Sequence, residues 1–357
     1  MAQNRPVKKR TPRASARNGG AARRRLLWIG GIIIVVALVI AGVAAGMAMH
    51  PYKGNDTWLY IPRDATEKSM SDSLRARLGS AEANRIMTFF SAVGGEPRRA
   101  AGAYLIRHGQ RTLSISRNLA RGMQTPVRVS WNSARTLQQL AGIIASQLDF
   151  TPEEFLQACN EELTAQGYKA PEFMAAFLPD SYEFYWTTTP EAAVRRMTQS
   201  RDRFWTDDRR EKARKLGLTP VEVATLASIV EEESAKPDEY PAIARLYMNR
   251  LKKGMLLQAD PTVKYATGNF ALRRITGEHL RTPSPYNTYL HPGLPPGPIR
   301  TPSKSTIDRV LSAPAHTYLY MCAKEDFSGY HNFASDYATH TANARRYQKE
   351  LNRRGIK

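Results

Sequence analysis

The sequence predicts an α+β protein carried on a single N-terminal transmembrane helix. Three observations indicate this class: an uncharged apolar run near the N-terminus, alternating and helix-periodic segments after it, and a helix-rich C-terminal half with short extended runs. The chain has 357 residues, of which 42% are apolar. It is therefore long enough for two or three folded units and too apolar to be disordered.

The apolar run covers Leu26–Met49, 24 residues without a charged side chain. At a rise of 1.5 Å per residue it makes about 36 Å of helix, enough to cross a bilayer. Residues 1–25 hold nine Lys or Arg and no acidic residue. The positive-inside rule then predicts a basic cytoplasmic tail (1–25), a transmembrane helix (26–49) and an exported remainder. A signal peptide cleaved near Ala44-Ala45-Gly46 is the alternative.

The formal net charge of +20 is unevenly distributed. Without the nine basic residues of the tail, the other 332 residues carry only +11. Since membrane topology explains the strongest basic cluster, we expect the lipid bilayer as a partner through residues 26–49 and no nucleic acid.

The two cysteines, Cys159 and Cys322, lack the spacing of a zinc site. This leaves two separate thiols or one disulfide bridge.

The first exported segment, 58–130, alternates short extended and helical pieces, so we expect a small α+β module. In order these pieces are Trp58–Ile61, a helical stretch from Ser69 to Val93, Ala103–Ile106, a short helix at Leu113–Ala120 and Pro126–Ser130.

Residues 131–217 read as a mostly helical connector, with Ser133 and Thr151 as helix N-caps. Its aromatic segment Phe177–Tyr185 fits a binding groove, although such a density of aromatic residues is more often found in a core.

The C-terminal domain, 218–357, begins with a capping box, Thr219 and Glu222, around Pro220. With Pro237 as the stop, this predicts a helix of about 16 residues that ends near Lys236.

The remaining C-terminal elements follow from apolar periodicity and from Pro and Gly positions. They are a helix at Pro241–Lys253, an extended run at Met255–Gln258, a Pro-rich loop at Thr282–Pro302, a helix at Lys304–Leu311, strands at Thr317–Ala323 and His331–Ala334, and a basic terminal helix.

Glu233 is the strongest candidate for chemistry. Leu226, Ile229 and Val230 form an apolar helix face, and the same face continues to Glu233, whereas Glu231 and Glu232 point elsewhere. Partial desolvation, two neighbouring carboxylates and the helix C-terminus all raise the pKa of a carboxyl group at this position. Such a group, protonated near neutral pH, can protonate a glycosidic oxygen. A solvated acidic helix end is the alternative from spacing alone.

Two further clusters carry polar groups at turns. Gln258, Asp260 and Thr262 surround an Asp-Pro turn, and Tyr286-Asn-Thr-Tyr289 precedes the stiff Pro292–Ile299 loop. From its residues alone, the first cluster is more typical of a surface turn. The aromatic faces and hydrogen-bonding groups of the second suit sugars, and they also suit a proline-rich partner site.

These segments together resemble the endolytic murein transglycosylases, the MltG or YceG-like family. The resemblance rests on Leu226–Ser234 (LASIVEEES), Tyr247–Leu251 (YMNRL), Gly254–Val263 (GMLLQADPTV), Tyr286–Tyr289 and Gly293–Ile299, which occur in the family's order and spacing. It is strong from about 218 to 340 and weaker over the earlier segments, where the family carries a LysM-like module, expected here at 58–130.

The resemblance implies that Glu233 is the catalytic glutamate. It also places a set of residues along the glycan groove: Glu231, Gln258, Asp260, Thr262, Tyr286, Asn287, Thr288 and Tyr289. No cofactor or metal is implied. The family commonly has Lys at the position of Glu232, so this chain carries one more negative charge there.

The resemblance further implies a lyase of the inner membrane that faces outward. It cuts nascent peptidoglycan strands internally at the MurNAc–GlcNAc bond and leaves 1,6-anhydroMurNAc ends, with Glu233 as acid and then base. Penicillin-binding proteins are the implied partners. The alternatives are a hydrolase that uses Glu233 with Asp260, and a tethered scaffold that binds glycan without cleaving it.

Overall fold

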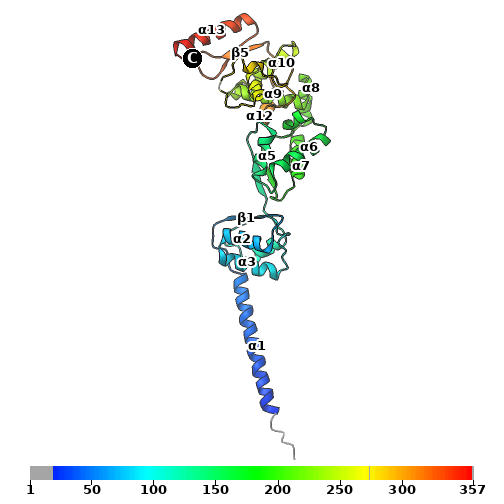
Figure 1. The fold of residues 1–357 in the computed structure, drawn as a ribbon, viewed down its shortest axis with the longest axis vertical. Helices are drawn as coiled ribbons and strands as arrows, with labels where there is room; N and C mark the ends of the chain where they lie inside the picture. Colours follow the sequence, from blue (N-terminus) through cyan, green and yellow to red (C-terminus); the bar gives the residue numbers. More distant parts are fainter. Residues whose placement is uncertain (1–18, 273, 356–357) are drawn as a thin grey trace, which may run out of the picture. The chain divides into compact units, whose positions relative to one another are not determined.

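The computed structural model describes residues 19–272 and 274–355 and forms two compact units, which meet in sequence between Gln124 and Thr125. The fold is a mostly helical α+β fold, as predicted, and its strands form three separate antiparallel pairs within the described residues (Figure 1). Most of the predicted basic tail, residues 1–18, lies outside the described part of the chain.

The N-terminal unit begins with α1 (Gly19–Ala48), a helix of 30 residues. Its segment Arg23–Ala48 is long and apolar enough to cross a membrane, and its side chains are almost all exposed. The predicted apolar span is therefore one continuous helix, of a kind found in membrane anchors and in signal sequences.

The small module packs three helices against one strand pair. β1 (Thr57–Ile61) pairs antiparallel with β2 (Gly102–Ile106), as the alternating segments predict. The predicted single helical stretch from Ser69 to Val93 is wrong, because it is broken at Gly79, where φ is +85°. The helices are α2 (Glu67–Leu78), α3 (Ser80–Ala92) and α4 (Thr112–Ala120).

The C-terminal unit begins with a strand that the sequence analysis grouped with the module. β3 (Val127–Ser130) pairs with β4 (Ser181–Phe184), more than 50 residues later, so residues 125–130 belong to the C-terminal unit. The connector also contains this second strand and is helical elsewhere. Its helices are α5 (Leu137–Ala145), α6 (Pro152–Ala165), the 3₁₀ helix η1 (Ala170–Ala176), α7 (Pro190–Phe204) and α8 (Asp207–Leu216).

The aromatic segment of the connector belongs to the core and not to a groove. Phe177, Tyr182 and Phe184 are buried, and Tyr182 stacks on Trp131 with ring centroids 5.3 Å apart.

Both cysteines are free: Cys159 is buried in α6, and Cys322 is half-buried.

The remaining elements occur in the predicted order with small shifts. They are α9 (Pro220–Glu233), η2 (Pro237–Glu239), α10 (Tyr240–Lys252), α11 (Asp260–Thr267), η3 (His279–Arg281), α12 (Lys304–Leu311), β5 (Tyr320–Ala323), β6 (His331–Ala334) and α13 (Tyr337–Arg353). The Asp260-Pro261 pair starts helix α11 instead of a simple turn, because proline is well tolerated in the first turn of a helix.

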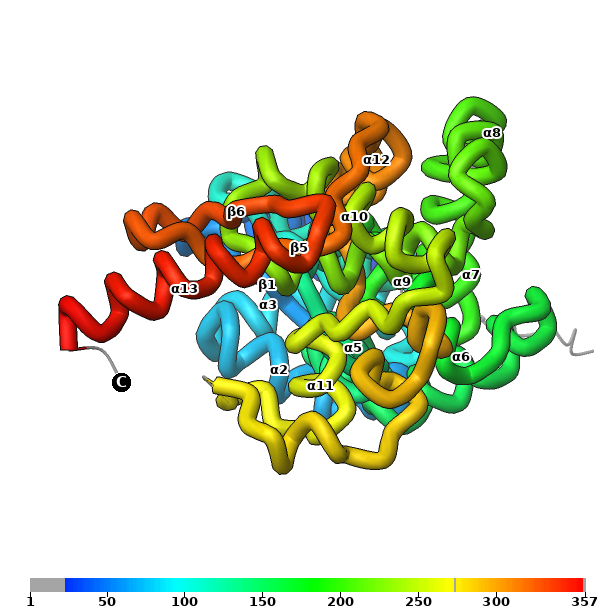
Figure 2. The backbone as a smooth tube through the Cα atoms, turned by 90° about the horizontal axis from the view of Figure 1, so that it is seen from above, coloured from blue at the N-terminus to red at the C-terminus, as the bar shows by residue number. Residues whose placement is uncertain are grey.

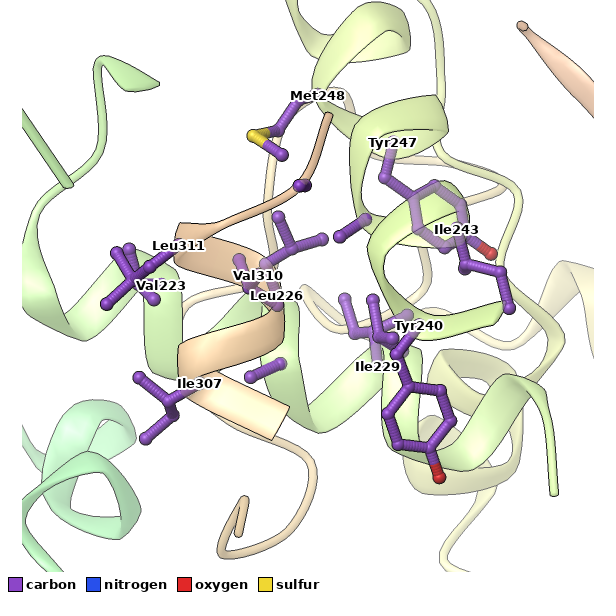
Figure 3. Packing of buried hydrophobic residues seen from close by; sticks show 14 of the residues in the cluster. Val223, Leu226, Ile229, Tyr240, Ile243, Tyr247, Met248, Ile307, Val310 and Leu311 are labelled. Carbon is purple, nitrogen blue, oxygen red and sulfur yellow. The ribbon is translucent and has the colours of Figure 1, made fainter. Parts of the chain in front are cut away.

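The core of this unit surrounds α9. Leu226 and Ile229 of α9 pack against Ile243 and Tyr247 of α10 and against Val310 of α12 (Figure 3). In Figure 2, α9 and α10, both yellow-green, and α12, in orange, lie close together, and each of the three contacts the other two. Since every residue from Val223 to Val230 is buried, α9 is a central helix with no solvated face over two turns.

The Pro-rich loop is seated against η1 and α9 at a position where only glycine fits. A Cβ atom on Gly297 would lie 1.8 Å from the carbonyl oxygen of Pro171, which is backbone and cannot swing aside. Two residues later, the Ile299 N–H donates to Ser228 Oγ on α9 at 3.0 Å. These two contacts therefore hold the Pro-rich loop against α9.

Gly297→Ala should lower the free energy of unfolding by about 1 to 3 kcal/mol, because the backbone must move to admit the methyl group. Gly142→Ala is the matched control. Gly142 lies in α5 with open space around it, so alanine there should be neutral or stabilising by up to about 1 kcal/mol. Denaturant unfolding of both variants measures this, and equal stabilities would contradict the packing.

Candidate active site

Helix α9 places Glu233 at its C-terminal end. The predicted capping box is confirmed: Thr219 N–H donates to Glu222 Oε2 (2.7 Å), and Glu222 N–H donates to Thr219 Oγ1 (3.2 Å). The helix ends at Glu233, three residues before the predicted end. Ser234 is extended, with φ −134°, and its Oγ accepts the Lys236 N–H at 3.0 Å, which stabilises the turn before Pro237.

Glu233 opens into a polar cavity of about 240 Å³. Four segments supply its walls: α10, the 257–260 loop with the start of α11, Tyr289, and the β5–β6 hairpin. The lining residues are Glu233, Leu246, Tyr247, Arg250, Leu257, Gln258, Asp260, Tyr289, Met321, Cys322, Ala323 and His331. A carboxyl group at the end of a buried helix thus meets an aqueous space surrounded by hydrogen-bonding side chains.

Glu233 has a strongly raised pKa. Burial raises its pKa from 4.5 to about 7, with a further upward contribution from the Asp260 carboxylate. The Tyr247 hydroxyl, which donates to Glu233 Oε1, and the positive charge of Arg250 oppose the shift. The predicted direction and the predicted role of desolvation are confirmed, but the carboxylate that acts on Glu233 is Asp260 and not its sequence neighbours.

Glu231 and Glu232 point away from the cavity, as the helix-face argument predicts for both. Glu231 accepts hydrogen bonds from the Ser303 N–H (3.1 Å) and from Thr306 Oγ1 (3.0 Å), at the start of α12. Glu232 is paired with Arg300 Nη1 at 2.6 Å. The structure therefore places Glu231, which the resemblance assigned to the groove, at a helix-to-helix contact.

Three of the expected groove residues do line the cavity. Gln258 has a positive φ of 51°, which turns its side chain so that Oε1 lies 3.3 Å from Arg250 Nη1. Asp260 Oδ1 accepts a hydrogen bond from the Tyr289 hydroxyl at 2.7 Å. Burial and the Asp260 carboxylate raise the pKa of Tyr289, so its phenol remains a donor.

The other expected groove residues support the loop behind this wall. Thr262 and Thr288 are buried and joined through their hydroxyl groups at 2.8 Å. Asn287 is fully buried and donates to the carbonyls of Leu280 (3.0 Å) and Thr282 (2.9 Å). Tyr286 packs against Tyr265, with ring centroids 4.6 Å apart and the ring planes tilted by 46°. None of these four residues lines the cavity.

Tyr247, Arg250 and His331 line the cavity and were not singled out from the sequence. Arg250 is only 8% exposed, and it donates from Nε to the Leu319 carbonyl (2.6 Å) and from Nη1 to the Leu257 carbonyl (2.8 Å). It therefore joins α10 to two walls of the cavity. The sequence contained a signal for it, since Arg250 lies seven residues after buried Ile243, on the same helix face.

Over residues 19–272 and 274–355, no group of three or more His, Cys, Asp or Glu side chains has the arrangement of a metal site.

The raised pKa of Glu233 predicts a pH-dependent stability. Below pH 4.5 the carboxyl group is protonated in both the folded and the unfolded state, and its contribution to stability is full. That contribution is lost as the pH rises through about 7, because the folded state resists ionisation. Between pH 5 and pH 8, the free energy of unfolding of the parent should therefore fall by roughly 2 to 3 kcal/mol relative to that of Glu233→Gln, whose amide does not titrate. Parallel pH profiles would contradict the raised pKa.

Comparisons with known proteins identify relatives of this chain. A relative from Bacillus subtilis (strain 168), named endolytic murein transglycosylase, is 27% identical over 244 residues, which is 63% of this chain and 67% of the relative. A protein of the same name from Streptococcus pneumoniae (strain D39) is 26% identical over 295 residues, 74% of this chain and 53% of the relative. The chain thus spans about two thirds of the first protein and about half of the second.

The crystal structure of a yceG-like protein from Listeria monocytogenes matches the fold, with a TM-score of 0.54 and 23% identity. The match covers 80% of this chain and 97% of that one. The model of the YceG-like family matches residues 59–346, which include most of the module and the whole cavity. The chain is a member of the YceG-like family.

Proposed function

We propose that the chain is an endolytic lytic transglycosylase that cleaves the MurNAc–GlcNAc bond of nascent peptidoglycan strands. The observation that carries the proposal is a carboxyl group, Glu233, at the end of a buried helix and open to a polar cavity, where burial raises its pKa to about 7. The names of the curated relatives supply the substrate class. A scaffold that only binds glycan needs no acid of this kind.

Glu233 acts first as a general acid. Because Tyr247 donates its hydroxyl hydrogen to Oε1, the carboxyl proton resides on Oε2, which is free to face a glycosidic oxygen. Transfer of this proton breaks the bond between the anomeric carbon of MurNAc and the leaving oxygen, which departs as a hydroxyl group. Arg250 then stabilises the carboxylate left behind, since its charge favours the ionised form of Glu233.

Glu233 acts next as a base. Its carboxylate removes the proton of the MurNAc C6 hydroxyl, whose oxygen attacks the anomeric carbon and closes a 1,6-anhydro ring. The same residue recovers the proton that it gave up, so no water is consumed. Gln258, Asp260 and Tyr289 contact the sugars that flank the cleaved bond.

A hydrolase is the second candidate, because a second carboxylate lines the same cavity. Asp260 is close enough to raise the pKa of Glu233, and hydrolytic glycosidases use two carboxyl groups. The hydrogen bond from Tyr289 occupies one of its oxygens, which favours a role in sugar binding over activation of water. The products of the reaction separate the two candidates.

For localisation we propose that α1 anchors the protein in the cytoplasmic membrane as a single span, with its N-terminus inside and the small module and the C-terminal unit outside. The module (58–130 in the sequence analysis) is LysM-like and binds glycan, which brings the strand to the enzyme. Penicillin-binding proteins are the proposed partners, since nascent strands leave their active sites.

Glu233→Gln should lower turnover of purified glycan strands by at least about 10² to 10⁴, because the amide neither donates an acidic proton nor accepts one. The full-length chain in detergent is the material for this assay. Glu232→Gln is the matched control: its side chain faces Arg300 and lies outside the cavity, so its activity should stay near that of the parent. Near-parental cleavage by Glu233→Gln would rule out its role.

Digestion in ¹⁸O-labelled water should give 1,6-anhydroMurNAc ends without label, as measured by mass spectrometry of the muropeptides. Closure of the ring by the C6 hydroxyl incorporates no solvent oxygen. Asp260→Asn should keep this product while it weakens substrate binding. Labelled reducing ends that disappear in Asp260→Asn would instead establish the hydrolase.

A further inference from the structure

A buried carboxylate holds a histidine at the wall of the cavity. Glu239, at the end of η2, is only 7% exposed and uses both of its oxygens. Oε1 accepts the backbone N–H of His331 at 2.7 Å, and Oε2 lies 2.9 Å from His331 Nδ1. Oε2 also accepts a hydrogen bond from Ser234 Oγ at 3.0 Å. The segment that directly follows Glu233 is thereby joined to β6.

These contacts determine which ring nitrogen of His331 carries the proton. A carboxylate can only accept hydrogen bonds, so the nitrogen beside it, Nδ1, is the donor. In the neutral ring this tautomer leaves a lone pair on Nε2. The Nε2 atom has no hydrogen-bond partner among the described residues, and His331 lines the cavity together with Glu233.

Anchoring of the hairpin does not by itself require the ring. The pairing of Ala323 with His331, the Leu319 N–H bond to the Ala334 carbonyl (2.9 Å) and the backbone N–H bond to Glu239 already hold β6 in place. The other polar side chains of the cavity are engaged: Arg250 with carbonyls, Tyr247 with Glu233, and Tyr289 with Asp260. The ring of His331 is therefore held in one orientation, with Nε2 as the ring nitrogen left to contact whatever fills the cavity.

We propose that His331 is a substrate-binding residue, which accepts a hydrogen bond through Nε2 from a sugar hydroxyl next to Glu233, and that Glu239 positions it by fixing its tautomer. The inference rests on the proposed function, because it takes the occupant of the cavity to be a glycan. A sugar hydroxyl is a suitable partner, since its O–H can donate to the Nε2 lone pair.

Two substitutions separate this role from a structural one. His331→Ala removes the acceptor. Glu239→Gln keeps the size and shape of the carboxylate, and its carbonyl still accepts the His331 N–H. Its amide, however, donates to Nδ1, which moves the ring proton to Nε2 and turns the acceptor into a donor. The hairpin stays anchored while the group presented to the substrate is reversed.

The experiment measures binding of a GlcNAc–MurNAc tetrasaccharide to the full-length chain in detergent by calorimetry. All variants carry Glu233→Gln, so that the sugar is not cleaved. Adding His331→Ala or Glu239→Gln should raise the dissociation constant about three- to tenfold, the effect of one lost neutral hydrogen bond. Glu325→Gln is the matched control, because Glu325 lies on the same hairpin, pairs with Arg346 and does not line the cavity. It should leave the dissociation constant within about twofold.

Unchanged binding in both His331→Ala and Glu239→Gln would overturn the inference and leave the proposed function intact. Weaker binding in His331→Ala with unchanged binding in Glu239→Gln would overturn the tautomer assignment. If His331→Ala melts at a lower temperature than the parent, Glu239→Gln alone decides. Absence of tetrasaccharide binding in the Glu233→Gln parent would overturn the proposed function, and with it this inference.

Discussion

Burial of α9 on every side is the constraint on which the site depends. From Val223 to Val230 the helix has no residue in contact with bulk water, and α10 and α12 pack along it. The last residue of such a helix is carried to the edge of the core, where Glu233 meets the hydroxyl of Tyr247 and the space beyond. Its raised pKa follows from this position, because a carboxylate there would lose most of its hydration.

The three consecutive glutamates of α9 have three different environments, and of the three only Glu233 lines the cavity. Glu231 accepts hydrogen bonds at the start of α12, and Glu232 is paired with Arg300, which also reaches Ser133 at 2.6 Å. These contacts hold the end of α9 against the loop before α12 and the connector. Arg250 joins α10 to two further segments through the carbonyls of Leu257 and Leu319. Its positive charge lowers the pKa of Glu233 and so partly opposes the effect of burial.

Local signals in the sequence predicted the elements well where capping or periodicity defined them. The capping box of α9, the strands at Trp58–Ile61 and His331–Ala334, and the apolar face that leads to Glu233 are all present. Pairing over long sequence distances was not predictable, and β3 was therefore grouped with the wrong unit. A residue's place in a motif also did not show whether its side chain lines the cavity. Thr262, Asn287 and Thr288 were expected in the groove but are buried supports of the loop. Arg250 and His331 line the cavity and were not predicted as site residues.

The central claim is that the fold keeps Glu233 protonated near neutral pH. Carbon-13 NMR of the side-chain carboxyl groups, on protein labelled at glutamate Cδ and assigned by comparison with Glu233→Gln, tests it directly. The account predicts one carboxyl resonance that titrates with a pKa of about 7 and is missing from the variant. A Glu233 resonance that titrates near 4.5, with the exposed glutamates, would contradict it.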